Sequence, residues 1–157
     1  MVGKNIFLLV SMFFATFLNA DEIVLHTGFT KATLLKEVEL DLHSYAIQSI
    51  PATAELKRPI IFYGPNKSKQ NYGFKQCMLF GDARPDLSSL RFDIRFNSIL
   101  CRTENGEQLS GDLRGWASSD RDGTFGVITK ADANSMKVKK DEEITIVIQE
   151  GFLKPVD

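Results

Sequence analysis

The sequence predicts an all-β protein, a single barrel or sandwich-like domain of about eight short strands. Three observations indicate this class. Short segments alternate between apolar and polar residues, which is the period of a strand with one buried face. Turn signals of Gly, Asn and Asp separate these segments at regular spacing. The last segment, 144–149, is apolar on both faces, as expected for a strand in a central or barrel position.

Residues 1–20 have the features of a secretory signal peptide. A charged tip precedes an apolar run, 6–18, of about 13 residues, and Ala20 offers a small residue for cleavage. Such a run is too short to cross a bilayer comfortably as a helix. We therefore expect residues 21–157 to form one exported domain without a membrane-spanning segment. An uncleaved anchor is the alternative.

The two cysteines of this exported chain predict one disulfide, Cys77–Cys101. It would close a loop of about two dozen residues and stabilise the fold by about 3 kcal/mol in the chain-entropy model. Two buried free thiols are the alternative.

The first half of the mature chain is predicted to begin with a strand over 29–42. Its periodicity also fits a helical stripe, and Thr30 and Thr33 favour the strand. Segment 43–57 is predicted to be a loop, allowing one short helix, with a break at Pro51. Segment 58–63 predicts a strand with Pro59 at its start or on an edge, and a polar loop follows over 64–73.

The next predicted strand spans 74–81, with Phe74, Met78 and Phe80 on one face and Cys77 and Leu79 on the other. Residues 82–86 predict a tight connection into 86–101, the longest strand pattern in the chain. Its apolar positions are Leu90, Phe92, Ile94 and Phe96, and then the phase shifts to Ile99 and Cys101. A one-residue shift inside a strand predicts a β-bulge at Asn97-Ser98.

After Cys101, the pair Asn105-Gly106 predicts a hairpin with a type I′ turn. The returning strand is expected over 109–118. A turn at 120–123 and a strand over 125–130 follow. A short connection over 131–135, an extended segment over 136–139 and the final strand over 144–149 complete the chain.

Composition and motifs indicate a non-enzymatic protein. A formal net charge of −1 implies no general attraction to nucleic acid. The two histidines, His26 and His43, have no cysteine or carboxylate cluster at ligand spacing, so neither a metal site nor a cofactor is expected. We also expect no catalytic residues, because no base lies near a nucleophile.

One set of residues is a candidate interface. Trp and Arg are favoured where proteins meet. The candidates are Arg91, Arg95, Arg114 and Trp116. Scattered barrel-surface positions are the alternative.

Several motifs occur in an order that resembles one protein family. Cys77-Met-Leu-Phe-Gly81, Asp86-Leu-Ser-Ser89, Arg91-x-x-Ile94-Arg95 and Cys101 resemble the central block of TraB proteins, the F-type conjugation members of the TrbI family. The flanking segments 28–35, 111–126 and 144–151 resemble that family's opening strand, hairpin and final strand.

The resemblance implies a non-enzymatic structural subunit of a type IV secretion or conjugative transfer apparatus. It also implies a homo-oligomer or ring member, located in the periplasm and associated with the outer-membrane core complex. The expected partners are a TraV-like lipoprotein and a TraK-like secretin-related protein. The resemblance also supports the predicted Cys77–Cys101 disulfide.

This sequence departs from the family at two places. The barrel pattern begins directly after the signal segment, where the family has an inner-membrane helix and a long periplasmic arm. Only a few polar residues near 131–136 occupy the position of the family's helical antenna. We expect a barrel-only member. A stand-alone periplasmic binding or regulatory module that reuses this barrel is the alternative.

Overall fold

The computed structural model describes residues 23–25, 28–44, 49–57, 62–63, 69–70, 74–119 and 125–157. These residues form strands, turns and loops, without a helix, so the all-β prediction is confirmed. The predicted signal peptide, His26 and the turn over 120–123 lie outside the described residues. Of the loop expected over 64–73, only Lys69–Gln70 are described, and they form a short strand instead.

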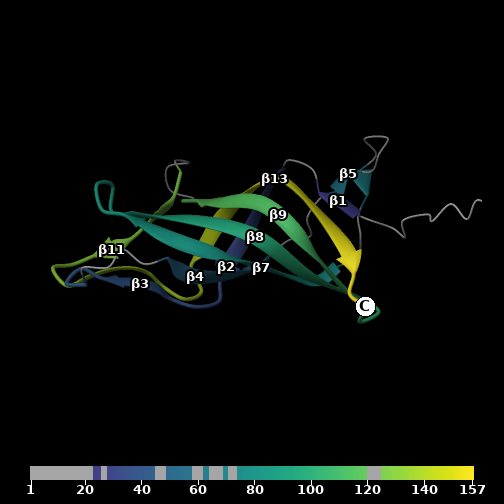
Figure 1. The fold of residues 1–157 in the computed structure, drawn as a ribbon, viewed down its shortest axis with the longest axis horizontal. Coiled ribbons are helices and arrows are strands. Elements are labelled where there is room, and N and C mark those ends of the chain that lie inside the picture. Colours follow the sequence, from purple (N-terminus) through teal and green to yellow (C-terminus); the bar gives the residue numbers. More distant parts are fainter. Residues whose placement is uncertain are drawn as a thin grey trace, which may run out of the picture.

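The described residues form thirteen strands, whose arrangement Figure 1 shows. They are β1 Ile23–Leu25, β2 Gly28–Leu34, β3 Val38–Asp41, β4 Ile50–Leu56, β5 Phe62–Tyr63, β6 Lys69–Gln70, β7 Phe74–Asp86, β8 Arg91–Thr103, β9 Gln108–Ser118, β10 Val127–Ile128, β11 Lys130–Ala131, β12 Ser135–Val138 and β13 Glu143–Pro155.

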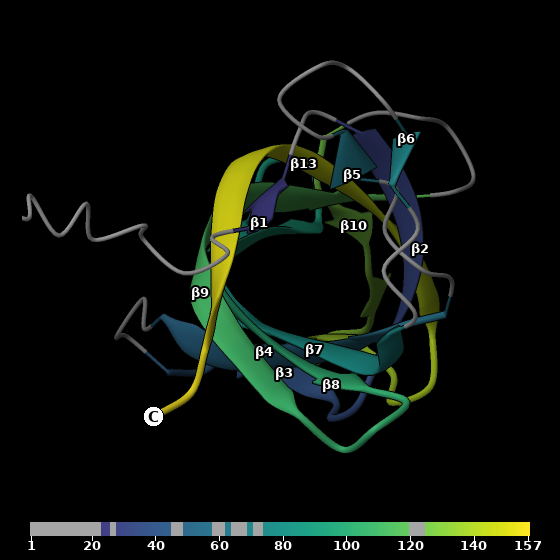
Figure 2. The same cartoon turned by 90° about the vertical axis from the view of Figure 1, so that its right-hand side faces the viewer.

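The largest sheet closes on itself as a barrel. β13 pairs antiparallel with β2 along one edge and with β9 along the other. From β9 the ladder continues through β8, β7 and β4 and returns to β2. Seen end-on, the strands surround a common interior (Figure 2). β1 and β10 extend this ring by pairing with free stretches of β13 and β8.

The barrel interior is the hydrophobic core, and strand alternation explains its contents. In β8, Phe92, Ile94 and Phe96 are buried, whereas Arg95 and Asn97 between and after them are exposed. In β13, Ile144, Ile146 and Ile148 face the same core. Because these buried side chains alternate with more exposed ones, one face of each strand packs inside the barrel and the other points outward.

The predicted bulge at Asn97-Ser98 is confirmed. Phe96 pairs with Gly81 and Ser98 pairs with Phe80, so Asn97 is one residue more than its partner strand provides. The extra residue shifts the phase, and Ile99 and Cys101 enter the core where an unbroken alternation would have faced them outward.

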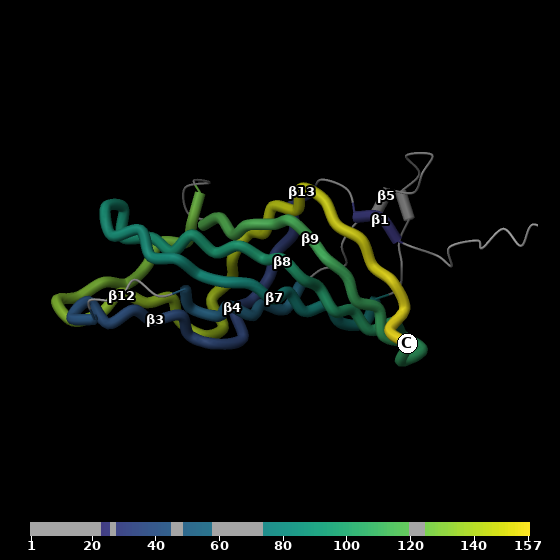
Figure 3. The backbone as a smooth tube through the Cα atoms, in the orientation of Figure 1, coloured from purple at the N-terminus to yellow at the C-terminus, as the bar shows by residue number. Residues whose placement is uncertain are grey.

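A second, three-stranded sheet of β11, β12 and β3 lies at one end of the molecule, and the C-terminus lies at the other (Figures 1 and 3). Val38, Leu40, Met136 and Val138 from this sheet are buried in the same core cluster. β11 and β12 are joined by residues 132–134 alone, which confirms the predicted short connection. Asp132 accepts hydrogen bonds from the backbone N–H groups of Asn134 and Ser135, and these lower its pKa.

Three segment predictions were wrong. The strand expected over 29–42 is two strands, because the chain bends at 35–37 and passes from the barrel to the small sheet. The loop expected over 43–57 contains strand β4, and Pro51 lies near its start. The Pro51 position pairs only with β7, so that stretch of β4 is a free edge where a missing N–H is tolerated. The connection expected over 82–86 belongs to β7.

Three smaller details also differ. Phe74 is buried with Cys77 and Leu79, because the β7–β8 register shifts between Phe74 and Gln76. Leu90 is half exposed in a turn with φ 54°. In the Asn105-Gly106 hairpin only Gly106 has positive φ, at 83°. The hairpin is confirmed, but its turn is not type I′, which needs positive φ at both residues.

The pattern expected over 125–130 is likewise divided, between β10 and β11. Of the strand expected over 58–63, the described residues Phe62–Tyr63 form β5, which pairs with β6. The strands expected over 109–118, 136–139 and 144–149 are confirmed, and the last extends to Pro155.

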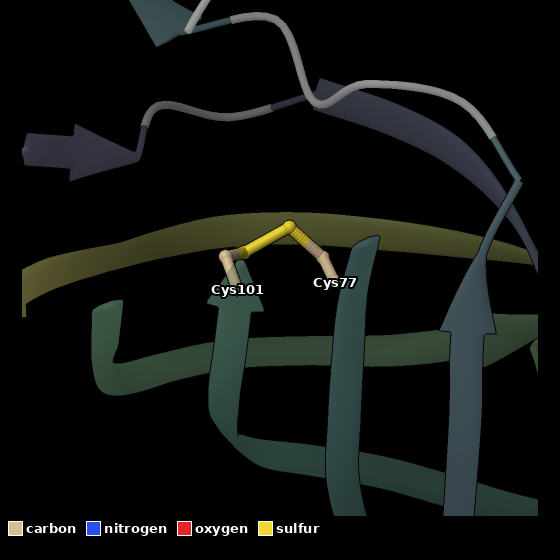
Figure 4. Close-up of a disulfide and its surroundings, with 2 residues drawn as sticks. All are labelled: Cys77 and Cys101. Atoms are coloured by element: carbon tan, nitrogen blue, oxygen red, sulfur yellow. A yellow bond between two sulfur atoms is a disulfide. The ribbon is translucent and has the colours of Figure 1, made fainter. Parts of the chain in front are cut away.

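The predicted disulfide is present. Cys77 and Cys101 pair directly in the β7–β8 ladder, and the disulfide joins them (Figure 4). Both residues are buried. Cys101 also pairs with Leu109, and Leu109 pairs with Pro155, so the bond lies at the C-terminal end of the barrel.

A carboxylate organises the turn between β7 and β8. Asp86 accepts hydrogen bonds from the hydroxyl and backbone N–H of Ser88 and from the hydroxyl of Ser89. The two serine side chains, Ser88 first, lower the pKa of Asp86 to about 2. The Asp-Leu-Ser-Ser motif therefore forms the turn that reverses the chain between β7 and β8.

Candidate functional site

A row of outward side chains crosses four strands of the barrel. Phe29 of β2 pairs with Val147 of β13, Val147 pairs with Trp116 of β9, and Trp116 pairs with Arg95 of β8. Laterally paired residues share a sheet face. Aromatic and aliphatic side chains are thus gathered on the outer surface, away from the core.

A second aromatic ring covers Trp116. Phe125 stacks on the indole with ring centroids 5.4 Å apart and an interplanar angle of 26°. The backbone before β10 holds Phe125 there, because Gly126 donates a hydrogen bond to the carbonyl of Ala117 and accepts one from Ser119. Phe29 and Phe125 are 79% and 70% exposed. Large contiguous apolar patches are uncommon on the exposed surface of a soluble monomer, and they mark interaction sites.

Three strand irregularities lie side by side next to this aromatic group. Asn97 is the bulged residue of β8, and Leu113 and Arg114 of β9 lie opposite it. Gln149 is the extra residue of β13 between Ile148 and Glu150. Asn97, Arg114 and Gln149 are all exposed. Two primary amides and one guanidinium therefore gather at a single place on the outer face.

Each arginine here has a carboxylate of the same chain beside it. Arg95 Nη2 lies 3.0 Å from Asp93 Oδ2, and Arg114 Nη1 lies 3.2 Å from Glu150 Oε1. Exposed pairs of this kind add about 0–1 kcal/mol to stability. Their greater effect is to balance the charge locally, so the surface does not present a cationic patch.

Beyond the bulges the surface becomes apolar again. Val24 of β1 pairs with Phe152 of β13, and the ammonium of Lys154 lies 5.3 Å from the centroid of the Phe152 ring. The chain approaches itself closely here, because a Cβ on Gly111 would lie 1.6 Å from the Phe152 carbonyl oxygen. Gly111 thus allows β9 and β13 to come together under this end of the surface.

These surfaces form one continuous groove along β9 and β13. A hollow of about 610 Å³ lies over Val24, Arg114, Gln149 and Phe152. A hollow of about 480 Å³ shares Arg114 and Gln149 with it and reaches Trp116. A third, of about 380 Å³, continues over Trp116 and Phe125 to Phe29. We call this surface the β9–β13 groove. It has an aromatic end at Trp116, a polar centre at the bulges and an apolar end at Phe152.

Three of the four predicted interface residues meet in this groove, namely Arg95, Arg114 and Trp116. Arg91 does not line any of the three hollows. It pairs with Asp86 and Ile128 at the far end of β8.

The sequence did not single out Phe29, Phe125, Asn97 or Gln149 as site residues. For the two phenylalanines a signal was available, since each begins a predicted strand as a large apolar residue. Only strand pairing shows that these positions converge.

The described residues offer binding contacts in the groove but no metal site. Among them, no group of three His, Cys, Asp or Glu side chains could hold a metal ion. His43 lies in an exposed turn with its Nε2 3.0 Å from Asn134 Oδ1. The carboxyl groups with lowered pKa, Asp86 and Asp132, are held in turns outside the groove.

Within the described ranges, no helix is long and apolar enough to span a bilayer.

A scan against models of known protein families finds no match, and a comparison with curated proteins finds no significant similarity. The family resemblance of the Cys77–Cys101 block therefore stays a prediction.

Proposed function

We propose that this protein is a non-enzymatic structural subunit of a type IV secretion or conjugative transfer apparatus. It acts in the periplasm by binding other subunits of the core complex. In this proposal the partners are a TraV-like lipoprotein, a TraK-like secretin-related protein and further copies of the same chain.

One observation carries the proposal. The motifs of the central block that resembles TraB proteins fall in one hairpin of the barrel wall. Cys77–Gly81 lies in β7, Asp86–Ser89 forms the turn, and Arg91–Arg95 and Cys101 lie in β8. The described parts of the flanking segments lie mainly in β2, β9 and β13, which belong to the same ring. Motifs that lie along one closed barrel support a shared fold, whereas the proposed role rests on the resemblance itself, because a fold alone does not imply a function.

The β9–β13 groove supports a role in binding. Aromatic residues and arginine are enriched at protein interfaces, and Trp116, Phe125 and Arg114 line this groove. Three of the four arginine and tryptophan positions expected at an interface line this groove or its border.

The turn between β11 and β12 favours a second candidate function. The family's helical antenna would occupy this position, and here residues 132–134 close a tight turn on Asp132. A stand-alone binding or regulatory module could use the same barrel and groove to occupy a partner without joining a ring.

Purification of envelope complexes from cells that carry the tagged protein tests both proposals. The structural role predicts that the protein copurifies with ring-shaped core particles and that its deletion reduces transfer. Recovery as a monomer bound to one core subunit, with transfer increased on deletion, would support the regulatory module. If no core subunit copurifies and deletion leaves transfer unchanged, both proposals fail.

A further inference from the structure

We infer that the β9–β13 groove binds an extended, uncharged segment of a partner polypeptide with large apolar side chains at positions i and i+4. This inference rests on the proposed function only in taking the partner to be a protein. It specifies the chemistry and the spacing that the groove selects.

The ends of the groove define the two anchoring positions. Trp116, Phe125 and Phe29 form one apolar end, and Val24 and Phe152 form the other. Gly151 pairs with Leu113 and Lys154 with Ser110, so Phe152 lies opposite Asp112. Four residue steps of β9, from Trp116 to Asp112, therefore separate the two ends. At about 3.3 Å per residue these steps span about 13 Å.

That span matches an extended peptide. Side chains at i and i+4 of an extended chain are about 13 Å apart and point to the same side. In an α-helix the same two side chains are only about 6 Å apart. A helix reaches about 12 Å only between positions i and i+8, and its backbone N–H and C=O groups are already bonded within the helix. The polar centre between the two apolar ends therefore favours a strand-like occupant over a helical one.

The polar centre fits the backbone of such an occupant. Asn97 and Gln149 carry primary amides, each of which has both donor and acceptor atoms. An extended peptide exposes N–H and C=O groups that need such partners when its apolar side chains are buried. The bulges place these amides between the two anchoring ends, where the backbone of the occupant would pass.

The paired charges of the groove disfavour anionic ligands, and its stacked aromatic rings disfavour sugars. Arg95 is balanced by Asp93 and Arg114 by Glu150. A phosphate group or an acidic peptide would have to displace one of these carboxylates. Phe125 already covers a face of Trp116, which reduces the flat aromatic area on which a sugar ring could stack. An uncharged polypeptide segment needs neither change.

The test uses the purified full chain and a capped nine-residue peptide. The peptide carries Phe at its third and seventh positions, with Ser, Thr and Gln elsewhere. Two control peptides have Ala at both anchoring positions, or Phe at the third and sixth positions, whose side chains point to opposite sides. Trp116 is the single tryptophan of the sequence, so its emission reports occupation of the groove directly. Calorimetry gives the affinity.

We expect the first peptide to shift the emission of Trp116 saturably and to bind at least about tenfold more tightly than either control. Phe152→Ala and Phe125→Ala should each weaken binding about tenfold. Leu87→Ala is the matched control, because Leu87 is an exposed apolar residue in the distant β7–β8 turn. It should leave the affinity unchanged.

Equal affinity for the three peptides would overturn the inference. So would emission that responds to a chitin oligosaccharide and not to the peptide, which would indicate a glycan site. A dimer that buries Trp116 and is dispersed by Phe125→Ala would replace the peptide with a second copy. None of these results bears on copurification with core particles, so the inference and the proposed function can fail separately.

Discussion

Cys77 and Cys101 lie directly opposite each other in the β7–β8 ladder, with their Cα atoms 4.1 Å apart and their sulfur atoms joined. The bond links two strands that hydrogen bonds already pair. It lies next to the pairing of Leu109 with Pro155, where the C-terminal strand completes the barrel wall.

The first prediction concerns this disulfide. Removing it in the double variant Cys77→Ala/Cys101→Ala should lower the free energy of unfolding by about 2–4 kcal/mol, because the unfolded chain regains the freedom of the closed loop. Urea unfolding followed by circular dichroism measures the change. Wild-type protein in reductant is the control and should approach the stability of the variant. An unchanged urea midpoint would contradict the prediction.

The second prediction compares two glycines. A Cβ on Gly81 would lie 1.8 Å from the Arg95 carbonyl oxygen, next to the Asn97 bulge. Gly81→Ala should therefore force the β7–β8 ladder apart and cost about 3 kcal/mol or more.

Gly106→Ala is the matched control. A Cβ at this position would meet no atom within 4 Å, but Gly106 has a φ of +83°. The substitution should therefore lower the free energy of unfolding by only about 1 kcal/mol. Urea midpoints for the two variants decide the order, and equal losses would show that the close approach at Gly81 is not rigid.

The third prediction is a pH dependence that originates at Asp86. Its pKa is about 2 in the folded protein, against an ordinary value of 3.8. The stabilisation is complete above the ordinary pKa and is lost as the pH falls from about 4 to about 2. Melting temperatures of wild type and Asp86→Asn should converge over this interval.

The pKa of Asp132 is lowered too and acts in the same direction, so Asp132→Asn should show a similar convergence. A difference between wild type and Asp86→Asn that stays constant from pH 7 to pH 2 would contradict the assignment.

The fourth prediction compares an inward and an outward phenylalanine. Phe92 is fully buried, and Phe92→Ala should cost about 3–5 kcal/mol through lost burial and the cavity that remains. Phe29 is 79% exposed, and Phe29→Ala should change stability by less than about 0.5 kcal/mol. Thermal unfolding of both variants checks this contrast. A large loss for Phe29→Ala would show that the aromatic end of the groove supports the fold.

Much of β8 could be predicted because its signal is local. Alternation of Phe92, Ile94 and Phe96 with charged residues identifies the strand and its buried face, and the change of phase after Asn97 identifies the bulge. The disulfide followed from two cysteines in a chain with export features. The strand and bulge signals are each contained in a short run of residues, whereas the disulfide prediction needs only the count of two cysteines.

Strand β4 shows where local signals fail. Ala52, Ala54 and Leu56 do alternate into the core. However, alanine is depleted in strands and Pro51 suggests a break, so the segment reads as a loop. Its pairing with β7 makes it a strand, since the ladder supplies hydrogen bonds and the barrel supplies burial that the segment cannot provide alone.

The sequence by itself determined the fold class, the buried face of β8, the Asn97 bulge and the cysteine pair. Tertiary structure alone decided that the ring closes through β9 and β13, and that Phe29, Trp116, Phe125 and Phe152 share one groove with the bulged residues. The physical reason is the range of each effect. Side-chain alternation depends on neighbours along the chain, whereas the alignment of bulges across β8, β9 and β13 depends on the register of strands far apart in sequence.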